Sequence, residues 1–290
     1  MRHLIPFRIY ESINQKWIPV GFDRYNGIFL NRNTKGTWRV NPSTGLVDIR
    51  GDFRCYGSKI SKNLYDPPKG IKSFMGLIKF GSVTGNFTCF GNKLRSLEGA
   101  PKEVSGNFYF RNNGLRSLEG SPQKVGGSFN CSLNELQSLK GAPKEVGMGF
   151  NCSQNQLQSL KGAPKKVGGV FNCSRNQLQS LEGAPQEING RFFCDEFELI
   201  KGKWNMKGWL EVLEKGSENA QKLILTLPYL QPDSLNLELR RNPGKIVLLL
   251  SQAWKHMPDD LKSKIKIPKE YEDQFGLFTG FFETKIFKNI

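Results

Sequence analysis

Apolar residues recur every 21 positions through the middle of the chain. Each unit opens with a phenylalanine, and a cysteine or a second phenylalanine follows two positions later. This alternation predicts a short strand with one buried face. The opening residues are Phe87, Phe108, Phe129, Phe150, Phe171 and Phe192, and the residues two positions later are Cys89, Phe110, Cys131, Cys152, Cys173 and Cys194.

The rest of each unit keeps the same register. In the first unit, Leu94 and Leu97 are followed by a turn with Gly99 and Pro101, and the unit closes with Val104. Glycine permits a positive φ, and proline ends a regular element. One coil cannot bury its own apolar side, so successive coils must stack into a continuous core. The sequence therefore predicts a solenoid.

An asparagine occupies the position where each of the first five predicted strands ends, and Phe197 breaks the series after the sixth. Its side-chain amide can bond backbone groups of neighbouring coils that regular secondary structure leaves unsatisfied. We expect this column to act as a structural ladder. Its members are Asn92, Asn113, Asn134, Asn155 and Asn176.

The unit Phe-x-Cys-x-x-Asn-x-Leu-x-x-Leu resembles the leucine-rich-repeat family, with Phe and Cys in place of strand leucines. The resemblance covers about 110 residues, with five copies in register. Units such as 127–146, and the lead-in at 36–49, are similar to leucine-rich-repeat proteins of tailed bacteriophages. The resemblance implies an α+β fold with a single-layer, β-solenoid-like array, and a concave face that binds partners.

Both ends of the array depart from the repeat. Gly51–Cys55 repeats the strand pattern 34 residues before the first regular unit, which predicts an N-terminal cap with an insertion across 58–72. After Phe192 the pattern becomes helical, with Trp204, Trp209 and Leu210 covering the last coil. We expect a basic N-terminal segment (1–41), a repeat domain (42–200, regular over about 85–194) and a helical C-terminal region (201–290).

The strand positions beside the buried Phe and Cys are the candidate partner-binding surface. Asn and Ser fill the middle of this surface, and aromatic and arginine residues lie toward both ends. A rigid scaffold that displays such residues favours binding of a protein partner. The alternative, which we favour for the middle, is that near-identical Asn and Ser merely stack. The candidates are Phe90, Tyr109, Arg111, Asn130, Asn151, Asn172, Arg175, Arg191 and Phe193.

The positive charge is uneven along the chain. The net charge is +16, and residues 1–86 alone hold 14 Lys and Arg against 5 Asp and Glu, a net of +9. Such a region attracts nucleic acid through phosphate neutralisation. A DNA-associated protein is therefore the alternative function, and a merely soluble basic protein is the simpler explanation of the same charge.

Candidate chemistry is sparse. The two histidines, His3 and His256, lie in no catalytic or metal-binding motif, and the cysteines lack the spacing of a zinc site. We expect a reduced, buried cysteine column, no metal, no cofactor and no enzymatic activity. No apolar run is long enough to span a bilayer, and no secretory signal opens the chain, which favours an intracellular or virion location.

Two further hypotheses concern the ends of the chain. Ile9-Tyr-Glu11, followed by Ser12, resembles the site after which prohead proteases of large tailed phages cut. Cleavage after Glu11 would mark an internal capsid protein, although an ordinary N-terminal strand or helix explains the same residues. A host-directed effector with an active C-terminal region is the second alternative.

Overall fold

The fold is a parallel β-solenoid with a spacing of about 21 residues per turn, which confirms the predicted stacking of coils. The computed structural model describes residues 24–57, 74, 78–196, 198–199, 211–213, 215, 217–225, 232–254, 257, 259–276 and 279. The predicted insertion and the tryptophans after the array lie outside these residues, as do Glu11, Ser12, His3 and His256.

Each 21-residue turn is called a rung below. Rungs 1 to 5 begin at Phe87, Phe108, Phe129, Phe150 and Phe171.

The opening phenylalanines form one ladder of parallel, in-register strands. Phe53 in β2 (Val47–Arg54) pairs with Phe87, and the same register continues rung by rung to Phe192. The strands of this ladder are β4 (Phe87–Thr88), β6 (Phe108–Tyr109), β8 (Phe129–Asn130), β10 (Phe150–Asn151), β12 (Phe171–Asn172) and β14 (Phe192–Phe193).

A second ladder of short parallel strands runs beside the first. Its strands place a charged or polar residue outward and a valine or isoleucine inward. The sequence prediction missed this ladder, because a two-residue strand between turns carries too little periodicity to be recognised. Its strands are β3 (Phe80–Val83), β5 (Glu103–Val104), β7 (Lys124–Val125), β9 (Glu145–Val146), β11 (Lys166–Val167) and β13 (Glu187–Ile188).

The core is a set of residue columns that run the length of the array. The phenylalanine rings of neighbouring strands lie 4.8–5.7 Å apart, centroid to centroid, from Phe53 to Phe192. The cysteine column and the first leucines of rungs 1 to 4 are buried beside them. Each rung thus completes the apolar core of its neighbours, which is the reason that the coils must stack.

The asparagine column bonds each rung to the one before it. Asn155 accepts a hydrogen bond from the backbone N–H of Leu136 through Oδ1 (3.1 Å), and its Nδ2 donates to the carbonyls of Cys131 (3.1 Å) and Cys152 (3.0 Å). Asn113, Asn134 and Asn176 repeat the pattern. Buried backbone groups at the end of each strand are satisfied in this way.

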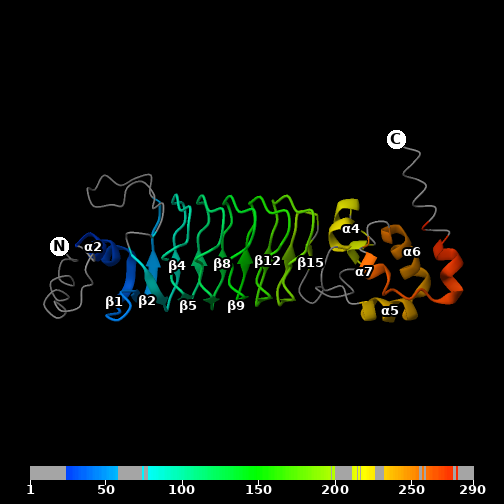
Figure 1. The fold of residues 1–290 in the computed structure, drawn as a ribbon, viewed down its shortest axis with the longest axis horizontal. Coiled ribbons are helices and arrows are strands. Elements are labelled where there is room, and N and C mark those ends of the chain that lie inside the picture. Colours follow the sequence, from blue (N-terminus) through cyan, green and yellow to red (C-terminus); the bar gives the residue numbers. More distant parts are fainter. Residues whose placement is uncertain are drawn as a thin grey trace.

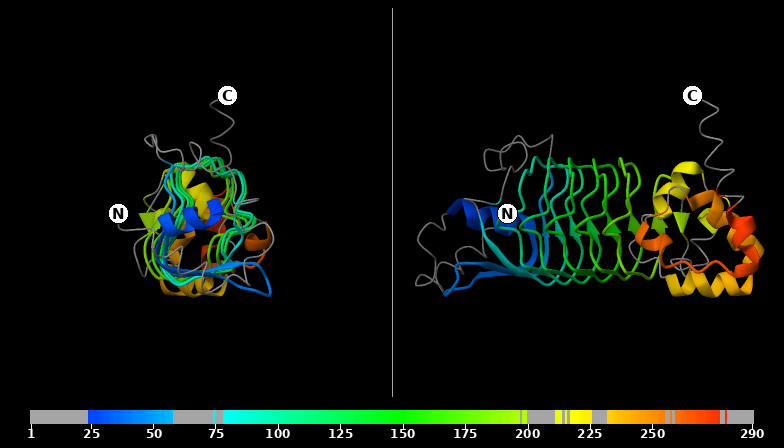
Figure 2. Two further views of the ribbon diagram at one scale, coloured as in Figure 1. Left: turned by 90° about the vertical axis from the view of Figure 1, so that its left-hand side faces the viewer. Right: turned by 45° about the vertical axis from the view of Figure 1, so that its right-hand side comes forward.

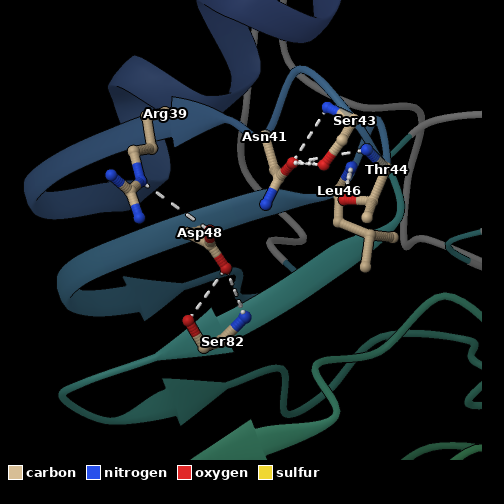
Figure 3. Close-up of polar contacts among 7 residues, drawn as sticks. All are labelled: Arg39, Asn41, Ser43, Thr44, Leu46, Asp48 and Ser82. Carbon is tan, nitrogen blue, oxygen red and sulfur yellow. Dashed lines mark hydrogen bonds and ion pairs between the residues drawn. The ribbon is translucent and has the colours of Figure 1, made fainter.

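A hairpin precedes the array. β1 (Thr34–Val40) pairs antiparallel with β2 along its whole length, and α2 (Arg24–Asn33) places the fully buried Leu30 against the core. In the hairpin turn, Asn41 Oδ1 accepts bonds from the N–H and hydroxyl groups of Ser43 (Figure 3). Asp48 then joins the hairpin to β3, because its Oδ1 accepts from the N–H and the hydroxyl of Ser82 (Figure 3).

Helices follow the array. β15 (Glu198–Leu199) pairs antiparallel with β14 and so covers part of the last strand. Pro232 and Pro243 begin helices, where the missing N–H of proline costs nothing. The elements are α4 (Glu218–Leu225), α5 (Pro232–Arg241), α6 (Pro243–Ala253), α7 (Asp259–Lys262) and the 3₁₀ helix η2 (Lys269–Tyr271).

The rungs follow one another along a straight axis (Figure 1), and they superimpose when viewed from the N-terminal end (Figure 2). The expectation of a concave face is therefore wrong. The strands of both ladders repeat with the same spacing, so neither side of the coil is compressed relative to the other and the array has no reason to curve. The candidate residues lie on a straight face.

Candidate binding surface

The outward side of the Phe strands carries two parallel columns of side chains. Phe and Cys point inward in each strand, so the residues one and three positions after the Phe point outward. From Arg54 on, the first column continues with Thr88, Tyr109, Asn130, Asn151, Asn172 and Phe193. The second column contains Tyr56, Phe90, Arg111, Ser132, Ser153, Ser174 and Asp195. Three members of these columns are covered by their neighbours and are buried: Thr88, Ser132 and Ser153. This surface is called the Phe-strand face below.

Three asparagines in the middle of the Phe-strand face share one fixed orientation. Asn130, Asn151 and Asn172 each accept a bond through Oδ1 from the backbone N–H two residues later, at 3.0 Å. Within the part of the chain that the structure describes, their Nδ2 groups donate no hydrogen bond. Because the carbonyl side of each amide is held, the NH₂ side is left for a ligand. These three residues are called the amide row.

The rungs bring the amide row between two half-buried aromatic side chains. Tyr109 pairs in register with Asn130, and Phe193 pairs with Asn172. Neighbouring strands lie about 4.8 Å apart, so the surface from Tyr109 to Phe193 extends for about 19 Å. Its middle carries no charged side chain.

The arginines predicted at the far end lie beside this surface. Arg175 lies in a turn with a positive φ of 55°, and its backbone N–H donates to the carboxylate of Asp195. Arg191 is exposed one residue before Phe192. They border the C-terminal end of the Phe-strand face.

At the opposite end, Phe90 and Arg111 belong to a different group of residues. Phe90 is 41% exposed, and its ring lies 4.6 Å from that of Tyr56, which is 48% exposed. The backbone N–H of Gly91 bonds the carbonyl of Arg111, which places Phe90 and Arg111 on adjacent rungs of the same column.

Three basic residues follow Phe90 and Arg111 around the same corner of the coil. Lys93 and Arg95 follow Phe90 in rung 1, and Arg116 follows Arg111 in rung 2; all three are exposed. Sequence reasoning did not select them, although a signal was available, since the matching positions of rungs 4 and 5 are Gln156, Gln158, Gln177 and Gln179. The group Tyr56, Phe90, Lys93, Arg95, Arg111 and Arg116 is called the basic corner.

The charge of the solenoid is concentrated at the same end. Residues 24–57 and 78–116 hold 12 Lys and Arg against 4 Asp and Glu, a net of +8. Residues 117–196 and 198–199 hold 8 against 8, a net of zero. The field of the array therefore favours anions at its N-terminal end.

The cysteine column offers no comparable chemistry. All six thiols are free and buried, and burial raises the pKa of Cys89, Cys152 and Cys173. Thiolates are the reactive form, so these groups are inert. At the end of the column, the pKa of Cys194 is lowered, mainly by a hydrogen bond from Cys173. The described residues contain no group of three or more His, Cys, Asp or Glu side chains arranged to hold a metal ion.

None of the helices among the described residues combines the length and the apolar character that a membrane crossing requires. Comparison of the chain with protein-family models, with curated proteins and with solved structures finds no match.

Proposed function

We propose that this chain is a non-enzymatic binding scaffold that recognises a protein partner through the Phe-strand face. The observation that carries the proposal is the amide row, with its three oriented donors between Tyr109 and Phe193. Half-buried aromatic side chains are typical anchors in protein interfaces, and donors that are already oriented lose little entropy on binding.

The rigidity of the solenoid supports this role. The strands below the amide row are held by ladder hydrogen bonds and by a fully buried phenylalanine column. Because the Oδ1 atoms are already occupied, the Nδ2 groups would point toward acceptors such as the backbone or side-chain carbonyls of a partner. The middle of this surface carries no charge that could pair with a charged group. A partner whose contacting side chains are also neutral therefore fits it best.

We also propose membership of the leucine-rich-repeat family, and the setting of a phage-infected bacterium or a phage particle. The 21-residue period, the leucine positions and the asparagine ladder support the family, whereas the second strand ladder is a feature that the short consensus does not imply. Mass spectrometry of infected cells and purified particles tests the setting, and the protein's absence from both would contradict it.

The test of binding replaces one side-chain NH₂ group of the amide row with an oxygen atom. Asn151→Asp keeps an oxygen for the N–H of Ser153 but replaces the Nδ2 donor with a charged acceptor. An unpaired charge in an interface is costly, so we expect capture of the partner to weaken at least tenfold, which corresponds to about 1.4 kcal/mol.

The matched control is Gln158→Glu, which adds the same charge at an exposed position of the same rung. Partners captured from a host lysate by the original chain and by the control, but not by Asn151→Asp, would support the proposal. Equal capture by all three proteins, with unchanged circular dichroism, would contradict it.

A further inference from the structure

We infer that the basic corner is a binding site for single-stranded nucleic acid. This site lies outside the amide row and does not depend on the proposed protein partner. The inference begins with exposed residues of rungs 1 and 2 that depart from the residues of the later rungs. The fold does not require these departures, because rungs 4 and 5 form the same coil with serine and glutamine at the equivalent positions.

The departures follow one chemical pattern. Three positions after the strand Phe, rungs 1 and 2 carry Phe90 and Arg111, while rungs 3 to 5 carry serine. Eight positions after it they carry Arg95 and Arg116, while rungs 3 to 5 carry glutamine. Aromatic and cationic side chains thus replace small or neutral ones on two adjacent rungs. A ligand with flat rings and negative charge matches this replacement.

The aromatic component is an exposed pair of rings. The centroids of the Tyr56 and Phe90 rings lie 4.6 Å apart, and the ring planes meet at an angle of 48°. Tyr56 is 48% exposed and Phe90 is 41% exposed. Most large apolar side chains of the solenoid are buried, so this pair is unusual within the array. Unpaired bases stack on such rings, whereas the bases of a duplex are already stacked on one another.

Most of the basic component is not neutralised within the part of the chain that the structure describes. Arg111, Lys93 and Arg95 form no ion pair within the described part of the chain, whereas Arg116 lies 3.1 Å from a carboxylate oxygen of Glu135. Other basic residues at the same end of the solenoid also form no ion pair with any described residue: Lys35, Arg50, Lys79 and Lys102. Lysine and arginine near a phosphate backbone release condensed counterions, which provides affinity at low salt.

These two components together favour single-stranded nucleic acid over other anions. An anionic membrane or an acidic peptide would use the basic residues but would leave the ring pair without a specific partner. A duplex would use the charge but not the rings. The basic corner spans about two strand spacings, roughly 10 Å, which suits a contact of a few nucleotides.

The experiment measures binding of a fluorescently labelled oligothymidylate by fluorescence anisotropy over a range of salt concentrations. Each variant replaces a residue with the one that later rungs carry at the same position: Phe90→Ser, and the double change Lys93→Gln with Arg95→Gln. Because the later rungs fold with these residues, the variants should keep the fold, which circular dichroism checks.

We expect the oligothymidylate to bind more tightly than a duplex of equal length. Phe90→Ser should weaken binding about tenfold with little change in the salt dependence, because a stacked base is lost. The double variant should weaken binding and reduce the slope of log K against log salt by about 1.4, since each phosphate contact of a single strand contributes about 0.7.

The control removes the same amount of charge elsewhere. Lys144→Gln with Lys165→Gln changes two exposed lysines that form no ion pair among the described residues, close in sequence to β9 and β11 of the second ladder. Equal weakening in this control would mean that net charge alone attracts the oligonucleotide, and would overturn the inference. So would a duplex or polyglutamate that binds as tightly as the oligothymidylate, or no binding at low salt. Asn151→Asp should leave oligothymidylate binding unchanged, so this inference and the proposed function can fail separately.

Discussion

Leu133 adopts a backbone conformation that suits glycine or asparagine better than leucine. Its φ is 57°, and the same turn of the coil places Gly91, Asn112, Gln154 and Arg175 at φ values of 55–65°. Side chains with a Cβ are strained in this region, although asparagine tolerates it. The turn geometry is imposed by the strand and the asparagine ladder on either side.

Replacing the leucine should therefore stabilise the protein. We expect Leu133→Asn to raise the free energy of unfolding by about 1 kcal/mol, measured by urea denaturation. The reverse change on the neighbouring rung, Asn112→Leu, should lower it by a similar amount. A destabilised Leu133→Asn variant would show that packing of the half-buried leucine outweighs the backbone strain.

At the level of elements, β2 stands where a preceding rung would otherwise lie. Its carboxylate Asp52 accepts hydrogen bonds that an asparagine side chain accepts farther along the array. Asp52 of β2 accepts bonds through Oδ1 from the backbone N–H of Asn86 (2.8 Å) and from its Nδ2 (3.1 Å). Asn86 Oδ1 in turn accepts from the N–H of Asn107, and Asn107 Oδ1 from that of Ser128. A short side-chain ladder therefore begins at a carboxylate.

These bonds make the contribution of Asp52 dependent on pH. The hydrogen bond from the Asn86 backbone, followed by the pairing with Arg54, lowers the pKa of Asp52 below its ordinary value of 3.8. A lowered pKa means that the folded state favours the ionised form, so its contribution is complete above about pH 4 and is lost as the pH falls through the folded-state pKa.

We expect Asp52→Asn to lower the free energy of unfolding by about 1–2 kcal/mol at pH 7, since bonds to a charged acceptor are strong. The difference from the original chain should stay constant down to pH 5 and shrink below pH 3.8. Urea denaturation at several pH values measures it, with Glu98→Gln as a control on an exposed carboxylate. A difference that does not change with pH would contradict the role of the Asp52 charge.

The sequence predicted the elements where the pattern is long or repeated. The 21-residue period predicted the strands that begin at the repeated phenylalanines. The strands of the second ladder were missed, because two residues that alternate once do not distinguish a strand from a loop. The straight axis was missed because curvature depends on the spacing of both sides of the coil, which a family resemblance cannot supply.

The candidate site was predicted only in part, for a related reason. Alternation along the strand placed Asn130, Asn151 and Asn172 on one face, but nothing in the sequence showed that their Oδ1 atoms are already occupied. The basic corner requires residues from two rungs and from β2 to be considered together. A comparison of rungs 1 and 2 with rungs 4 and 5 would have identified most of it.

At the scale of the whole molecule, the two proposed sites lie in different parts of one array. The basic corner belongs to rungs 1 and 2, and the amide row belongs to rungs 3 to 5. In an array of this kind each rung contacts mainly its neighbours, so the stability is close to a sum of similar contributions. An internal rung can therefore be removed while both ends remain intact.

Deletion of residues 150–170 removes rung 4 and joins Gly149 to Phe171, so that the columns of rung 5 stack on those of rung 3. We expect a folded, soluble protein with a smaller urea m-value, because less surface is exposed on unfolding.

Oligothymidylate binding should be unchanged, since the basic corner is untouched. Capture of the protein partner should weaken, since the amide row loses Asn151 and the distance from Tyr109 to Phe193 shortens by one strand spacing. Loss of oligothymidylate binding from a folded deletion variant would mean that the nucleic-acid site extends beyond the first two rungs. Unchanged partner capture would place the protein-binding surface at the ends of the array and outside the amide row.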